Sequence, residues 1–187
     1  MTERLVLPSD EGHLHLLRRW LFFAVSALGI AGAFAFLAVL TRTPAVQILH
    51  SAEGLHRAIA GHVTFSLLVW LLAFEAVLWI VAAGPAPDRR RSWWGLGLMV
   101  AASGFLIAAV LSGRGVPILT DYVSVVVDPL FFVGLLALAV GVGLVARDSV
   151  RRTSGRSGLL SHGMRCAGAL AALAVAACLV TLVRLGA

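Results

Sequence analysis

The stretch from His56 to Trp79 holds the residues whose chemistry is hardest to explain by packing alone. It reads HRAIAGHVTFSLLVWLLAFEAVLW and is apolar enough to cross a bilayer, yet it carries His62 near one end and Glu75 well inside. Imidazole and carboxylate groups at membrane depth are costly, so they are rare and usually functional. Neutral imidazole is a good ligand for heme iron, and packed helices commonly hold that ring. His62 is therefore the first candidate for a cofactor ligand.

Glu75 cannot share a site with His62 on a regular helix. Glu75 follows His62 by thirteen positions, which places it about 20 Å deeper, and thirteen steps of 100° leave the two side chains about 220° apart. Glu75 is a separate candidate for a buried proton or hydrogen-bond site. A heme with two axial histidines would need a second histidine at the depth of His62. The other apolar segments contain none, and His162 lies at the opposite membrane face. A heme at His62 would need a ligand from another chain; the alternative is a hydrogen bond from His62 to a neighbouring helix.

Two other groups of polar residues allow alternative interpretations. Asp128 could be a buried proton or hydrogen-bond site, or it could cap a helix that begins at Pro129, with residues 122–127 approaching it as extended chain. His50, Glu53 and His56 could be metal ligands, but their spacing fits no compact motif. We expect a polar loop over residues 42–57, marked by proline and glycine.

The composition is that of an integral membrane protein. Hydrophobic residues make up 60% of the chain and charged residues 13%, against roughly 45–50% and 25% in soluble domains. About 20 apolar residues are needed to cross ~30 Å of hydrocarbon, and such segments recur. The sequence therefore predicts an all-α bundle of about five transmembrane helices, over residues of about 19–41, 58–83, 94–111, 123–146 and 166–183.

The arginines predict the orientation of these helices. All 15 basic residues are arginine. Eleven of them flank the membrane face that carries the N-terminus, and four flank the other face. Cytoplasmic loops are enriched in basic residues, so this ratio favours an N-in, C-out topology. Residues 1–17 would form a cytoplasmic arm, either irregular or a surface helix, with solvated histidines at His13 and His15, and residues 18–187 the membrane domain. The arginines lie at segment ends and form no single basic face, so nucleic acid is not the expected partner.

Small residues predict where helix backbones approach one another. In the first segment they are Gly29, Gly32, Ala33 and Ala35; in the third they are Gly95, Gly97, Ala101, Ala102 and Gly104. Cys166 and Cys178 lie about 18 Å apart along one predicted helix, too far for a disulfide.

Three stretches resemble a known family: RRWLFFAVSALGIAGAF, then AGHVTFSLLVWLLAF, then VPILTDYVSVVVDPLFFVGLLALAVG. Over residues 18–146 they resemble the N-terminal part of heme–copper oxidase subunit I, and most of all a divergent bacterial branch of subunit I-like proteins. The resemblance implies that His62 matches the axial histidine of a low-spin b- or a-type heme. The family has about twelve spans, and its copper ligands lie on later helices that are absent here. Asp128 stands where the family motif has a histidine.

The resemblance implies a membrane subunit of a respiratory electron-transfer complex in the bacterial inner membrane, with other membrane subunits as partners. It would be related to a truncated or split subunit I, with no copper site and no catalysis by this chain alone. One alternative is a heme-free structural or assembly subunit, in which His62 and Glu75 only pack helices. A small transporter is a third alternative, but the chain has no internal repeat.

Overall fold

The computed structural model describes residues 10–43, 51–82, 88–119 and 124–153, and helical positions between 162 and 180. Four helices in this part of the chain are long and apolar enough to cross a membrane: Glu11–Leu40, Ala52–Ala82, Arg89–Leu111 and Pro129–Arg151. The predicted all-α class is confirmed, and the four helices agree with a multi-pass membrane protein. Half of the predicted fifth span, residues 166–183, lies outside the described residues.

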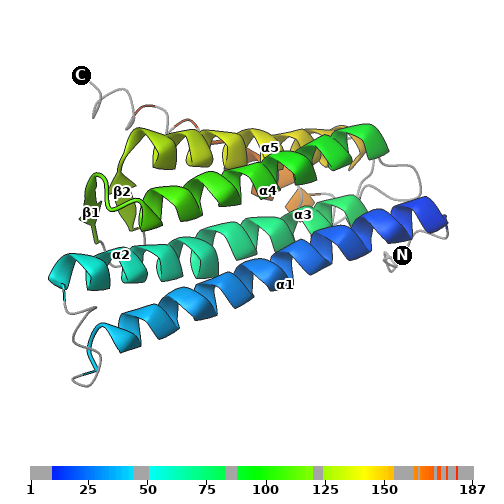
Figure 1. The fold of residues 1–187 in the computed structure, drawn as a ribbon. Coiled ribbons are helices and arrows are strands. Elements are labelled where there is room, and N and C mark those ends of the chain that lie inside the picture. Colours follow the sequence, from blue (N-terminus) through cyan, green and yellow to red (C-terminus); the bar gives the residue numbers. More distant parts are fainter. Residues whose placement is uncertain are drawn as a thin grey trace.

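The four long helices run alternately up and down (Figure 1). Helix α1 (Glu11–Leu40) packs against a second long helix made of α2 (Ala52–Val63), a π-helical turn η2 (Thr64–Val69) and α3 (Trp70–Ala82). Helices α4 (Arg89–Leu111) and α5 (Pro129–Thr153) form an antiparallel pair with extensive contact. We call the end where α1 and α4 begin the arginine end, because Arg18, Arg19 and Arg89 lie there.

A short β-hairpin lies at the opposite end of the bundle, which we call the hairpin end. Strands β1 (Val116–Ile118) and β2 (Val125–Val127) pair antiparallel, with Val116 opposite Val127. The chain between α4 and α5 thus satisfies some of its backbone hydrogen bonds before it re-enters the bundle. Strand β2 agrees with the alternative in which Asp128 caps a helix from Pro129 and extended chain precedes it.

Polar N-caps explain where three helices begin. Asp10 accepts a hydrogen bond from the His13 N–H (3.2 Å), Ser51 from the Gly54 N–H (2.8 Å), and Asp88 from the Arg91 N–H (3.2 Å). Each cap satisfies a backbone donor that has no partner inside its helix. All three caps place helix starts earlier than the sequence analysis did, because a capped helix can begin in polar sequence before the apolar run.

Four predicted boundaries are wrong. Helix α4 begins at Arg89 rather than at residue 94. Helix α1 begins at Glu11, so residues 11–17 belong to the bundle and His13 is only 6% exposed. The prediction of a solvated surface histidine holds for His15 alone.

The predicted loop ends at Ser51, so Glu53 and His56 lie on α2, and His50 lies outside the described residues. The predicted fourth span begins at Pro129 rather than at residue 123.

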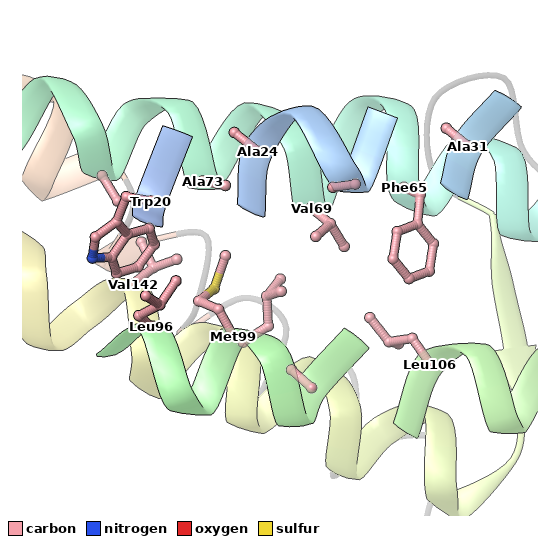
Figure 2. Close-up of a cluster of buried hydrophobic side chains, with 14 of the residues drawn as sticks. Trp20, Ala24, Ala31, Phe65, Val69, Ala73, Leu96, Met99, Leu106 and Val142 are labelled. Carbon is pink, nitrogen blue, oxygen red and sulfur yellow. The ribbon is translucent and has the colours of Figure 1, made fainter. Parts of the chain in front are cut away.

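The core is built from large side chains on some helix faces and from alanines on other helix faces. Trp20, Phe65 and Met99 are fully buried (Figure 2), as is Trp79. Ala24, Ala27 and Ala31 line the buried face of α1, and α3 also buries alanines, at Ala73, Ala76 and Ala82. These alanines, and not Gly29 or Gly32, are the small residues that face the bundle. Both glycines have open space where a Cβ would lie, so the prediction that they mark a close contact is not met within the described part of the chain.

On α4 the prediction from small residues is half right. Ala102 is buried, and a Cβ on Gly95 would lie 2.8 Å from the Gly141 carbonyl oxygen. A Cβ on Gly141 would lie 2.9 Å from the Gly95 carbonyl, so the two glycines let α4 and α5 touch backbone to backbone. Gly97 and Gly104 face outward instead, because they lie on the other side of the helix.

Candidate functional site

His62 lies at the contact between α2 and α1. Its ring is partly buried, and Nδ1 lies 3.0 Å from the backbone carbonyl oxygen of Ala31. A carbonyl oxygen only accepts hydrogen bonds, so Nδ1 carries the proton and donates it. In the neutral ring, Nε2 then keeps its lone pair. This is the arrangement of metal-bound histidines, which donate their second nitrogen to a carbonyl or carboxylate.

Gly61 brings the two helices close enough for this hydrogen bond. A Cβ on Gly61 would lie 2.7–2.9 Å from three atoms of the Phe34 ring. Phe34 is buried and lies 6.0 Å from the ring of Phe65, measured between centroids. The Phe34 ring thus fills the space that a side chain at position 61 would need. The glycine next to His62 is a packing requirement of the site.

The π-helical turn η2 begins two residues after His62. Its wider winding is closed by the Trp70 N–H, which donates to the Phe65 carbonyl five residues earlier. Such turns are rare and occur often at functional sites. The turn also changes the rotation between α2 and α3, so the angle of 220° between His62 and Glu75, which assumes one regular helix, does not apply. The two residues lie on different helical segments and form no common site.

A polar cluster ties the start of α2 to the hairpin end. Arg57 is only 7% exposed; it pairs with Glu53 at 2.8 Å and donates to the carbonyls of Arg114 (2.9 Å) and Gly115. Gly115 has φ +69°, and a Cβ there would lie 2.1 Å from the Val127 carbonyl, so both backbone conformation and space require glycine. Sequence analysis counted Arg57 only as a loop charge, although its i,i+4 spacing from Glu53 pointed to this pair.

Asp128 caps α5, which confirms one of its two interpretations. Its Oδ1 accepts a hydrogen bond from the Leu130 N–H at 2.8 Å, and Pro129 takes the first helical position. Proline suits that position because its missing N–H would have no partner there. Asp128 is 8% exposed, so the carboxylate is buried in a structural role at the start of the helix.

Glu75 and the predicted loop cluster lack a metal-site geometry. Glu75 is partly buried on α3, and within the described residues it has no hydrogen-bond or ion-pair partner. Glu53 is engaged by Arg57, and His56 is exposed. No group of three histidine, cysteine, aspartate or glutamate side chains gathers closely enough to hold a metal ion among the residues that the structure describes.

Comparisons with known proteins give distant relatives only. No protein-family model matches the chain, and no solved structure matches it. An uncharacterized protein of Aquifex aeolicus is 29% identical over 127 residues, which are 67% of this chain and 31% of that protein. An uncharacterized protein of Rickettsia prowazekii is 31% identical over 65 residues, which are 34% of this chain and 13% of that protein. This chain therefore spans less than a third of the length of the relatives that it matches.

Proposed function

We propose that this chain is a membrane subunit of a respiratory electron-transfer complex, in which His62 is an axial ligand to a low-spin heme. The observation that carries the proposal is the Nδ1 contact of His62 with the Ala31 carbonyl, 3.0 Å. It fixes the tautomer and the direction of the ring, and it leaves Nε2 as the nitrogen able to bind iron. The resemblance of residues 18–146 to heme–copper oxidase subunit I supports the same assignment.

A heme would supply one-electron transfer, and this chain would contribute one imidazole to it. We propose that the other axial ligand comes from a partner membrane subunit, because the apolar segments of residues 1–187 contain no second histidine at that depth. Both relatives are longer than the part that they share with this chain. This chain would then correspond to one part of a larger membrane assembly, with no copper site of its own.

The setting that we propose is the bacterial inner membrane, with five spans and an N-in, C-out orientation. The arginine distribution supports it: Arg18, Arg19 and Arg89–Arg91 lie at the arginine end, whereas Arg42, Arg57 and Arg114 lie at the hairpin end. Basic residues favour the cytoplasmic face. His62 would then lie near the outer face.

A second function has its own support in the same contact. A hydrogen bond between an imidazole and the backbone of a neighbouring helix stabilises helix packing in membranes by about 0.6 kcal/mol on average. His62 would then hold α1 to α2 in a heme-free structural or assembly subunit. Glu75, without a partner in the described residues, would face another subunit in such a complex.

Reduced-minus-oxidised visible spectra of the protein, purified with its co-purifying subunits, separate the two functions. We expect a low-spin b- or a-type band that is lost in His62→Ala. His56→Ala is the matched control, because His56 is exposed on the same helix and its replacement should leave the band intact. His62→Met should retain a band at a different reduction potential, because thioether sulfur also ligates heme iron.

The proposal fails if no heme band accompanies the wild-type complex, or if the band survives in His62→Ala. In the first case, a loss of partner subunits from His62→Ala would assign the residue to assembly instead.

A further inference from the structure

A groove between α1 and α4 combines a charged mouth with an apolar floor. These two helices run parallel, and both begin at the arginine end (Figure 1). The groove has a volume of about 730 Å³; Phe22, Ser26 and Ile30 line it from α1, and Val100, Gly104 and Ile107 from α4. Arg19, His15 and Trp93 lie at its mouth. We propose that the groove binds one anionic glycerophospholipid, with an acyl chain along the floor and the phosphate at the arginines.

The length of the groove matches one leaflet of a bilayer. From Leu96 to Ile107, α4 rises about 17 Å, which is about half of the ~30 Å hydrocarbon core. Trp93 lies at the mouth, where tryptophan side chains prefer the membrane–water interface. An acyl chain that starts at the level of Trp93 would therefore run the whole groove and end near the bilayer midplane.

The floor of the groove offers an acyl chain an apolar surface. Phe22 and Ile30 from α1 and Val100 and Ile107 from α4 line the floor with apolar side chains. Gly104 keeps the floor open, because no atom lies within 4 Å of the position that its Cβ would take.

The charges at the mouth suit a phosphate. A polar cup of about 590 Å³ adjoins the groove at His15 and Trp93, whose rings lie 6.0 Å apart, and Arg18 and Arg89 line it. Neither Arg18 nor Arg19 is ion-paired within the described residues. Glu11 also lines the cup, and Asp10 lies 3.7 Å from Arg89. Arg18, Arg19 and Arg89 outnumber the carboxylates of Glu11 and Asp10. Basic pockets between helices at the membrane surface bind anionic headgroups.

Native mass spectrometry of the delipidated protein, with its co-purifying subunits, tests the proposal. Dioleoyl phosphatidylglycerol should bind more tightly than dioleoyl phosphatidylcholine. Arg19→Gln should weaken phosphatidylglycerol binding about fivefold, the factor that about 1 kcal/mol per arginine implies, and should leave phosphatidylcholine binding unchanged. Arg42→Gln, at the hairpin end, should leave both lipids unaffected.

A second variant tests the apolar floor. Gly104→Leu should remove the tightly bound lipid by filling the groove, without a clash inside the protein. Gly97→Leu is its matched control, because Gly97 is equally open on α4 and does not line the groove. Equal affinity for the two lipids, or unchanged binding in Gly104→Leu, would overturn the proposal. So would loss of a co-purifying subunit from Gly104→Leu with lipid binding intact, because the groove would then belong to a protein interface.

Discussion

Replacing Gly61 by alanine tests the packing that positions His62. The added Cβ would lie 2.7 Å from Cδ1 of Phe34, whereas carbon atoms at their best separation are about 3.5–4.0 Å apart. The Phe34 ring or the helices would have to move by about 1 Å. Because Phe34 is buried between α1 and α2, we expect overpacking to cost about 1–3 kcal/mol. Alanine also favours a helix over glycine by about 1 kcal/mol, which partly hides that cost.

A double-mutant cycle with Phe34→Ala separates the overpacking cost from the gain in helix propensity. The gain in helix propensity at residue 61 is present in both backgrounds, so it cancels in the coupling energy. Without the Phe34 ring, Gly61→Ala should stabilise the protein by about 1 kcal/mol. The coupling between the two substitutions should therefore equal the overpacking cost alone, about 1–3 kcal/mol. Reversible unfolding of the four proteins in mixed micelles measures it.

The matched control is Gly32→Ala combined with Phe34→Ala. Gly32 is on α1 and has open space at its Cβ position, so its substitution should be additive with Phe34→Ala. Additive effects at Gly61 as well, within about 0.5 kcal/mol, would refute the close approach of α1 and α2 that we describe beside His62.

Three further substitutions test other parts of the fold by unfolding or hydrogen exchange. Gly95→Val should destabilise the α4–α5 pair by about 1–3 kcal/mol, because the new valine side chain would collide with the Gly141 carbonyl. Gly97→Val is the control and should cost far less. Equal losses of stability in the two variants would contradict the glycine contact. Arg57→Met removes the charged donor to the carbonyls of residues 114 and 115 and should lower the stability of the protein by about 1.5–3 kcal/mol. Amide hydrogen exchange in β1 should become faster. Unchanged exchange would refute the role of Arg57 in holding the hairpin. Asp128→Ala should cost about 0.5–2 kcal/mol as a lost N-cap, and Asp128→Ser should recover most of it; no recovery would argue against capping.

The sequence determined the membrane character and the helical class, because both depend on local composition. Long apolar segments have to hydrogen-bond their own backbone in a bilayer, and helices do so within one segment. The cap at Asp128 was also available from the sequence, since Asp-Pro before an apolar run is a local signal. Helix starts at Glu11, Ala52 and Arg89 were missed, because each apolar run begins several residues after the polar cap.

Which face of each helix turns inward was decided only by the tertiary structure. Gly29, Gly32 and Gly95 looked alike as small residues, but only Gly95 meets a neighbouring backbone. The same holds for the candidate site: the sequence pointed to His62, whereas its hydrogen bond to Ala31 depends on how α1 crosses α2. The buried role of Arg57 likewise depends on carbonyls that lie 57 and 58 residues away. Contacts between distant segments depend on packing of whole helices, which no local pattern of residues specifies.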